Sequence, residues 1–325
     1  METAVVTATA ATTVGAPWTP ARKAEVAQLI KPITLAQAED EFRQLVALGP
    51  AAGTKGPRCR LGNNVVDFFT FAQRLETRGK YNVNYYEFVD QLDTVFKQKV
   101  FVANMLHYYE TVKNKNGRKH PYVVYKEVFN ICVSAINIIR PLVYMELYTR
   151  FQPQRRVLDF CAGWGGAAVA AAALGVPYVG IEINTALRAP YASLLAFLQE
   201  RVAPSPPFDV DVRFEDATET DYAGLDYDVV FTSPPYYFIQ RYEGNVPYVS
   251  KDDMDARFYR PVFTRTYAHL RPGGTYALNV NREVYERVAR PCLGEAHEMF
   301  AFGKSQRQNA YQEQVYVWRK PAVVA

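Results

Sequence analysis

The chain has 325 residues, 49% of them hydrophobic, which suffices for a sizeable core in two domains or in one large domain with an extension. It has no run of about 18 uncharged apolar residues, so we expect no membrane partner. Its first residues lack the basic start and apolar stretch of a signal peptide. The four cysteines and four histidines show no metal-ligand or disulfide spacing. We therefore expect no metal and a reducing intracellular location, cytoplasmic or nuclear.

The formal net charge of +4 is unevenly distributed. Residues 1–150 carry 19 Lys and Arg against 13 Asp and Glu, whereas residues 151–325 carry 18 against 20. A basic first half indicates a polyanionic partner such as nucleic acid, although ordinary surface lysines explain the bias equally well.

The first 150 residues are predicted to be mostly helical. Residues 1–20 are small and polar and are expected to form a flexible tail. Amphipathic patterns, first from Ile33 to Ala47 and last as one helical stretch from Tyr122 to Phe151, predict a helical region over residues 21–150. This region is a candidate for target recognition, with a lid, a dimerisation surface and a scaffold as alternatives.

From Arg155 onward the pattern changes to strands that alternate with helices. Apolar runs predict strands at residues 157–160, 177–183, 209–217, 227–237, 274–280 and 312–320, and an alanine-rich helix is expected to end at Gly175. Such alternation predicts an α/β fold with a parallel sheet covered on both faces. Ligands of such sheets bind beyond the carboxyl ends of the strands.

Glycines and acidic residues follow the first three of these strands. Gly163 and Gly165 allow a tight turn and close approach of a ligand, but they also fit a dinucleotide-binding loop or a plain packing turn. Asp159, Glu182 and Asp216 each end a strand. Three acids in this order favour an adenosine ligand that has a positive centre and no phosphate, with Glu182 on ribose hydroxyls.

The most specific motif is Thr232-Ser233-Pro234-Pro235-Tyr236. Two prolines stiffen the backbone and remove two donors, so that the carbonyls of Ser233 and Pro234 can serve as fixed acceptors. Acceptors of this kind can bind both hydrogens of an aromatic amine, and the Tyr236 ring can stack on a base swung out of its helix. The alternative is a rigid loop that follows a buried strand.

The series DFCAGWGG, IEIN and TSPPYY resembles the S-adenosylmethionine-dependent amino-methyltransferases, most closely the DNA N4-cytosine and N6-adenine enzymes, over about residues 140–320. The resemblance implies a Rossmann-like class I methyltransferase fold over residues 151–325, with a mostly parallel seven-stranded sheet. It implies direct transfer of the methyl group, with Ser233, Pro234, Pro235 and Tyr236 as catalytic residues. The implied cofactor-binding residues are Asp159, Phe160, Ala162, Gly163, Gly165, Glu182, Ile183, Asp216, Ala217 and Thr232. The arrangement also resembles proteins encoded by large DNA viruses, which would make a virion location possible.

The target base and the polymer stay open. Ser at the head of the motif is commoner in the cytosine enzymes, but the glycine loop precedes the motif here, whereas many cytosine enzymes have the reverse order. We expect a DNA substrate. The alternatives are an RNA base amine such as guanine N2, an inactive binding module that kept the fold, and a nicotinamide-dependent oxidoreductase that uses the same glycines.

Three regions are candidates for nucleic-acid contacts, and each is equally well explained as ordinary surface. The first is the basic turn Lys113, Lys115, Arg118 and Lys119. The second is the long loop after the motif, with Tyr237, Arg241, Tyr242 and Tyr248. The third is a polar segment with Lys304 and Arg307. The oligomeric state cannot be inferred from the sequence.

Overall fold

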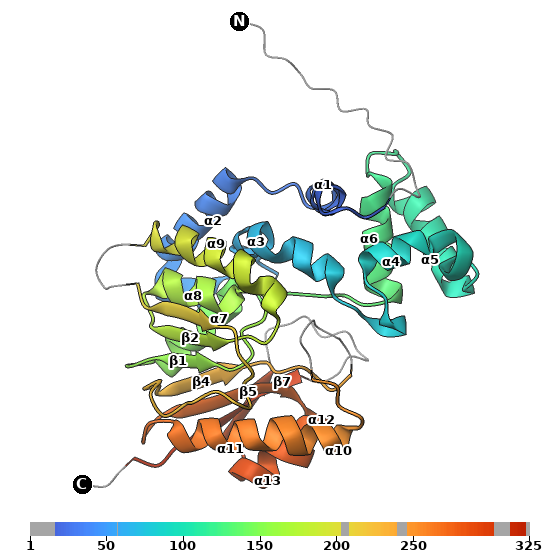
Figure 1. The fold of residues 1–325 in the computed structure, drawn as a ribbon. Helices are drawn as coiled ribbons and strands as arrows, with labels where there is room; N and C mark the ends of the chain where they lie inside the picture. Colours follow the sequence, from blue (N-terminus) through green and yellow to red (C-terminus); the bar gives the residue numbers. More distant parts are fainter. Residues whose placement is uncertain (1–16, 57, 203–207, 239–245, 302–312, 323–325) are drawn as a thin grey trace, which may run out of the picture.

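A computed structural model describes residues 17–56, 58–202, 208–238, 246–301 and 313–322 (Figure 1). In these residues seven strands form one sheet in the order β3-β2-β1-β4-β5-β7-β6. Strands β1 to β5 are parallel, and β7 runs antiparallel to both of its neighbours. The strands are β1 (Val157–Asp159), β2 (Tyr178–Ile181), β3 (Val210–Arg213), β4 (Val229–Thr232), β5 (Thr275–Asn281), β6 (Glu298–Ala301) and β7 (Glu313–Arg319). The predicted mostly parallel seven-stranded sheet is confirmed.

Helices precede the sheet and connect its strands. The α-helices are α1 (Pro20–Ile30), α2 (Leu35–Leu48), α3 (Asn63–Glu76), α4 (Tyr85–Asp90), α5 (Val100–Tyr108), α6 (Pro121–Cys132), α7 (Pro141–Phe151), α8 (Gly166–Leu174), α9 (Arg188–Gln199), α10 (Lys251–Met254), α11 (Arg260–His269), α12 (Arg282–Val284) and α13 (Arg290–Leu293). Shorter 3-10 or π turns are η1 (Gly49–Thr54), η2 (Lys80–Asn82), η3 (Leu92–Phe96), η4 (Tyr109–Lys113), η5 (Thr185–Leu187), η6 (Asp255–Tyr259) and η7 (Tyr285–Ala289). None of the described helices is long and apolar enough to span a bilayer.

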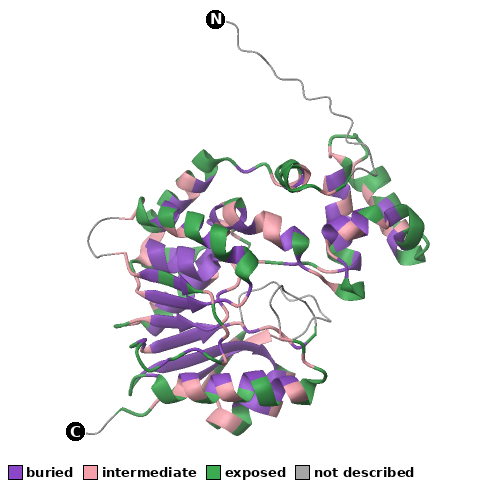
Figure 2. Cartoon of the chain, viewed as in Figure 1, coloured by how far each residue is buried: buried purple, intermediate pink, exposed green. Residues whose placement is uncertain are grey.

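Both faces of the sheet are covered by helices. Successive residues of a strand point to opposite faces, so each strand contributes to two hydrophobic clusters. Val157 and Val229 belong to one hydrophobic cluster, and their neighbours Leu158 and Val230 belong to another. Helices α2, α3, α7, α8 and α9 pack on the first face, and α11 with η6 and η7 packs on the second (Figure 1). The central strands β1, β2, β4 and β5 are buried along their whole length (Figure 2).

The predicted division at residue 150 does not follow the packing. Phe42 of α2, Val66 of α3 and Met145 of α7 lie in the same cluster as the alanines of α8, so these helices are part of the sheet-bearing unit. A separate core is built mainly by α1 and residues 80–132, with Val133 and, from the end of α3, Leu75. We call α1 and residues 80–132 the helical lobe. Helix α3 therefore contacts both cores.

Three other predictions need correction. The predicted tail extends too far, because α1 begins at Pro20 and the Trp18 ring lies 4.8 Å from that of Tyr86; residues 1–16 lie outside the described residues. The single helix predicted over 122–151 is interrupted at residues 133–140, since Pro141 starts a new helix and disfavours helical backbone at Arg140. Strand β6 was not predicted, because it lies at the sheet edge and alternates between half-buried and exposed residues.

The packing of α2 on the sheet-bearing unit can be tested with Phe42, which is 1% exposed and whose ring centroid lies 5.9 Å from that of Phe197 on α9. Phe42→Ala should lower the free energy of unfolding by about 3–5 kcal/mol, because it removes a buried ring and leaves a cavity. Leu35→Ala, in the same helix at a residue that is 45% exposed, is the matched control and should change stability little. Urea unfolding followed by circular dichroism measures both variants. Equal effects would contradict the described packing.

Candidate active site

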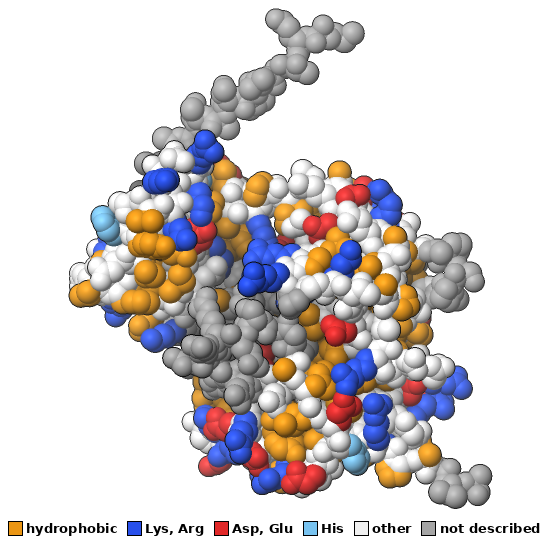
Figure 3. All heavy atoms as spheres, turned by 180° about the vertical axis from the view of Figure 1, so that it is seen from behind, with side chains coloured by type: hydrophobic (Ala, Val, Ile, Leu, Met, Phe, Trp, Pro, Cys, Tyr) orange, Lys and Arg blue, Asp and Glu red, His pale blue; other side chains and the backbone are white. Residues whose placement is uncertain are grey.

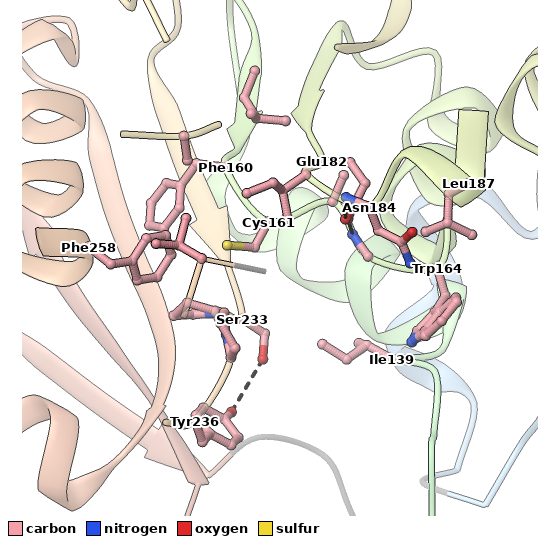
Figure 4. A pocket seen from close by; sticks show the side chains of 18 of the residues that line it. Ile139, Phe160, Cys161, Trp164, Glu182, Asn184, Leu187, Ser233, Tyr236 and Phe258 are labelled. Atoms are coloured by element: carbon pink, nitrogen blue, oxygen red, sulfur yellow. Dashed lines mark hydrogen bonds between the residues drawn. The ribbon is translucent and has the colours of Figure 1, made fainter. Parts of the chain in front are cut away.

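A cavity of about 690 Å³ lies at the carboxyl edge of the sheet. Its wall comes from the segments that follow β1, β2, β3 and β4, from residues 135–139 between α6 and α7, and from residues 246–258. This volume is in the range of about 300–1,000 Å³ that is usual for small-molecule sites. Figure 4 shows Ser233 and Tyr236 on one side of the cavity and Glu182, Asn184 and Trp164 on the other.

Glu182 joins two of the loops that form the cavity. One carboxylate oxygen accepts a hydrogen bond from the Gly163 backbone N–H at 2.8 Å, and the other accepts one from the Asn184 N–H, also at 2.8 Å. Burial raises the pKa of Glu182 to about 7, against the opposing effect of these backbone hydrogen bonds. Each carboxylate oxygen keeps a lone pair that can accept a further hydrogen bond from a ligand.

The cavity is acidic. Its described wall includes Glu182, Glu215, Asp216 and Glu313, and it includes no Lys, Arg or His. In Asp216, Oδ1 accepts hydrogen bonds from the backbone and side chain of Thr218, both at 2.8 Å. A ligand with a positive charge is favoured in such a cavity, and one with phosphate groups is disfavoured. The described residues contain no group of three or more His, Cys, Asp or Glu side chains that could hold a metal ion.

The proline motif presents unused acceptors to this cavity. Among the described residues, the backbone carbonyls of Ser233 and Pro234 accept no hydrogen bond, and both residues line the cavity. The carbonyl of Pro235, by contrast, is bound by the Tyr259 hydroxyl. The motif is thus anchored at Pro235 and has free acceptors at the two residues before it.

Asn279 on β5 fixes the side chains of the motif. Its amide nitrogen donates to the Ser233 hydroxyl oxygen at 2.9 Å and to that of Tyr236 at 3.0 Å. The Tyr236 hydroxyl in turn donates to the Asn279 backbone carbonyl at 3.1 Å. Asn279 is fully buried, so no water competes for these bonds. The Asn279 N–H uses one of the two lone pairs of the Ser233 hydroxyl oxygen. The other lone pair can accept a hydrogen bond from a substrate N–H.

Most of the predicted cofactor and catalytic residues lie together. The cavity wall includes Phe160, Ala162, Gly163, Glu182, Ile183, Asp216, Ala217, Ser233, Pro234, Pro235 and Tyr236. Asp159, Gly165 and Thr232 are not on the described wall, so the structure does not bring these three residues to the cavity with the others, and their contact with a cofactor stays a prediction. Asp159 is fully buried and binds the Cys161 N–H at 3.1 Å, Gly165 packs against Leu194, and Thr232 is fully buried at the end of β4.

Of the residues predicted to contact nucleic acid, Tyr237 and Tyr248 lie on the described cavity wall. Tyr237 lines the cavity, but it is only 6% exposed and its hydroxyl donates to Asp255 at 2.9 Å, so it is part of the wall instead of an exposed contact. The turn with Lys113, Lys115, Arg118 and Lys119 precedes α6, and that 12-residue helix separates it from the cavity-lining segment 135–139. Arg241, Tyr242, Lys304 and Arg307 lie outside the described residues.

Several residues of the site were not predicted. Trp164 and Asn184 stand within the motifs that pointed to this edge, and both line the cavity. Asn279 had a usable signal, since it is an amide inside an otherwise apolar strand and such a group must find partners when buried. The apolar residues of segment 135–139 continue the helical pattern of α6, and although Pro141 signals a break before α7, nothing in the segment signals a place on the cavity wall.

Comparison with protein-family models and with curated proteins finds no match. Solved structures do show similarity. TrmN from Thermus thermophilus is 20% identical over 55% of this chain and 48% of its own, with a TM-score of 0.37. The T. thermophilus 16S rRNA N2 G1207 methyltransferase RsmC is 21% identical over 57% of this chain and 44% of its own, with a TM-score of 0.38. An rRNA methylase from Streptococcus thermophilus is 11% identical over 57% of this chain and 99% of its own, with a TM-score of 0.38.

The similarity to TrmN and RsmC thus spans about half the length of those proteins.

The buried carboxyl of Asp159 leads to a prediction about pH. Burial raises its pKa to about 6, although hydrogen bonds from Thr232, Cys161 and Tyr178 oppose this effect. A folded-state pKa above the unfolded-state value contributes stability at low pH, which is lost as the pH rises through about 6. Asp159→Asn cannot ionise, so relative to wild type it should gain roughly 2–3 kcal/mol of stability as the pH rises from about 3 to about 7, with most of the gain between the unfolded-state pKa near 4 and the folded-state pKa of about 6. Melting temperatures of both proteins over this range test the expectation, and a difference that does not change with pH would contradict it.

Proposed function

We propose that the protein transfers a methyl group from S-adenosylmethionine to an exocyclic amino group of a DNA base, N4 of cytosine or N6 of adenine. The observation that carries this proposal is the set of residues that line one cavity. Glu182 and Asp216 lie on its wall together with the free carbonyl acceptors of Ser233 and Pro234, and no described wall residue is a cation.

The residues present fit S-adenosylmethionine, which when bound supplies an electrophilic methyl group on a positively charged sulfur. The acidic wall favours that charge. The Glu182 carboxylate has lone pairs for the ribose hydroxyls, and Oδ2 of Asp216 is available to an adenine amino group, since among the described residues only Oδ1 is hydrogen-bonded. Gly163 has φ +59, and the place of a Cβ there is open, with the Cys161 carbonyl 3.8 Å away as its nearest contact. The backbone can therefore approach a ligand closely.

The same wall weakens the case for a nicotinamide cofactor. A dinucleotide carries a pyrophosphate, which needs backbone N–H groups or cations nearby. In this cavity the Gly163 N–H is already bonded to Glu182, and the carboxylate would repel the phosphate charges.

The motif accounts for an amine as acceptor. The lone pair of an aromatic amine is delocalised into its ring, which makes the nitrogen a poor nucleophile. The Ser233 oxygen and the carbonyls of Ser233 and Pro234 can accept the two N–H hydrogens and hold the nitrogen with its lone pair toward the methyl group. The nitrogen would then attack the methyl group in line: a C–N bond would form as the C–S bond breaks with its electron pair on sulfur, and the methylated nitrogen would lose one proton to solvent water. Alignment of this kind lowers the barrier without a covalent enzyme intermediate.

The preference for DNA rests on the motif's resemblance to DNA amino-methyltransferases, since carbonyl acceptors fit any base amine. The decisive experiment is transfer of radiolabelled methyl to duplex DNA, single-stranded DNA, RNA and protein, followed by nucleoside analysis. Labelled N4-methylcytosine or N6-methyladenine in DNA is the expected product. Label in an RNA base amine would overturn the choice of polymer, and binding of S-adenosylmethionine without any transfer would favour a binding module.

Glu182→Ala should weaken S-adenosylmethionine binding about tenfold or more, because a hydrogen bond to a charged group contributes about 1.5–3 kcal/mol. Isothermal titration calorimetry measures the change, and thermal melting checks that the variant folds. Glu219→Ala, at an exposed acid that is not on the cavity wall, is the control and should bind as wild type does. Unchanged affinity in Glu182→Ala would remove the ribose assignment.

Asn279→Ala should lower kcat about 10- to 100-fold, because it releases the hydroxyls of both Ser233 and Tyr236 and small misplacements of reacting groups are costly. The KM for S-adenosylmethionine should stay within about twofold, since Asn279 is not on the cavity wall. Asn281→Ala is the matched control: Asn281 is buried on the same strand, and its side chain caps α12 through the Val284 N–H at 2.9 Å. That variant should lose about 1 kcal/mol of stability and keep its kcat. Equal kcat values in the two variants would show that Asn279 does not position the motif.

A further inference from the structure

The acidic cavity leaves the phosphates of a nucleic acid without a binding site. Phosphate contacts dominate the affinity of proteins for DNA and RNA, and Lys and Arg make most of them. No described residue of the cavity wall carries a positive charge. If the target base enters this cavity, the phosphates beside it have to be bound outside the wall, within reach of its edge.

One cluster of cations is attached to that edge. Lys55, Arg58 and Arg60 precede α3, and together with Arg140 we call them the basic cluster. The Arg140 guanidinium donates to the Cys59 carbonyl at 2.9 Å, so the segment that carries Arg58 and Arg60 is tied to the start of α7. Gly62 packs in the same place, where an added Cβ would lie 3.2 Å from Pro141.

The start of α7 is continuous with the cavity wall. Ile139 lines the cavity, and only one peptide unit, about 3.8 Å between Cα atoms, separates it from Arg140. The Ile139 carbonyl also lies against Gly166, which is on the wall too, since a Cβ added to Gly166 would lie 2.3 Å from that oxygen. Arg140 therefore adjoins the wall, and the segment that carries Arg58 and Arg60 is held to it through the Arg140–Cys59 hydrogen bond and the packing of Gly62 on Pro141.

The charges of Lys55, Arg58 and Arg60 are available to a ligand. Lys55, Arg58 and Arg60 are exposed, and none of them forms an ion pair with a described residue. The sequence has no Asp or Glu between Glu41 and Asp67. Figure 3, the view from behind, shows Lys and Arg side chains gathered near the boundary between the helical lobe and the rest of the molecule.

The basic turn singled out in the sequence fits less well. Lys119 is paired with Glu127 at 2.7 Å, and the Lys113 ammonium lies over the Tyr108 ring at 5.7 Å. The turn also precedes the N-terminal end of α6, whereas the cavity-lining residues follow the C-terminal end of that helix.

We propose that the basic cluster binds the backbone phosphates that flank the target base of a nucleic-acid substrate. This inference rests on the proposed function, because it takes a base in the cavity as given. Arg58 and Arg60 bind phosphate oxygens through their guanidinium groups, while Arg140 holds the segment against the cavity wall. The cluster reads phosphate, which DNA and RNA share, so it contributes affinity and not base preference.

The test is binding of fluorescently labelled single-stranded DNA, duplex DNA and single-stranded RNA of one sequence to full-length protein, measured by anisotropy between about 50 and 200 mM salt. Arg58→Ala/Arg60→Ala should weaken binding to the substrate polymer and lower the slope of log affinity against log salt by roughly 1.4 for a single strand or 1.8 for a duplex. Both residues are exposed, so the variant should fold, and its affinity for S-adenosylmethionine should equal that of wild type.

The control is Arg43→Ala/Arg155→Ala, which removes the same charge from two exposed arginines away from the cavity wall. It should bind nucleic acid with the wild-type slope. If the two double variants lose affinity equally, the effect is one of net charge and the cluster is not a specific site. If Arg58→Ala/Arg60→Ala binds and methylates as wild type does, this inference fails while the proposed function stands. If the wild-type protein binds no nucleic acid, the proposed function fails as well.

Discussion

The cavity depends on one buried carboxylate. Glu182 accepts a backbone hydrogen bond from each of two loops, the turn after β1 and the turn after β2, and thereby sets the distance between them. On its other side the turn after β1 is bound by the Tyr191 hydroxyl, which donates to the Gly163 carbonyl at 3.0 Å. Burial of this carboxylate raises its pKa to about 7, so keeping it ionised costs free energy. A ligand that donates hydrogen bonds to the carboxylate offsets that free energy.

The proposed function makes two electrostatic demands that oppose each other, and this chain offers residues for them in different places. A positively charged methyl donor is favoured by an acidic cavity, whereas a polyanionic substrate is repelled by one. The described wall carries the acids, and the exposed cations of the basic cluster lie next to it on a separate segment. This separation lets the charge of the donor and the charge of the polymer be neutralised independently.

The sequence predicted the site at the level of strand ends, but not the direction of each side chain. Glu182, Asp216 and Ser233 were placed correctly at the carboxyl edge because parallel strands end there together. Asp159 also ends a strand, yet its side chain is buried and accepts a hydrogen bond from the Cys161 N–H of the turn after β1. Neighbouring side chains of a strand lie on opposite faces, so a shift of one residue decides which face a side chain occupies. The interruption before α7 had a sequence signal in Pro141, which disfavours helical backbone at Arg140, but the apolar residues of segment 135–139 gave no sign that they line a cavity.

Helix α3 contributes residues to both hydrophobic cores, and its Thr70 hydroxyl lies 3.2 Å from the carbonyl of Trp164 on the cavity wall. At 14 residues it spans about 21 Å. The helical lobe is consequently not a cassette that recombination could exchange between proteins of this fold. A graft that cut the chain at either end of α3 would remove a wall of one core or the other, so the helical lobe cannot be exchanged at α3 without exposing apolar surface.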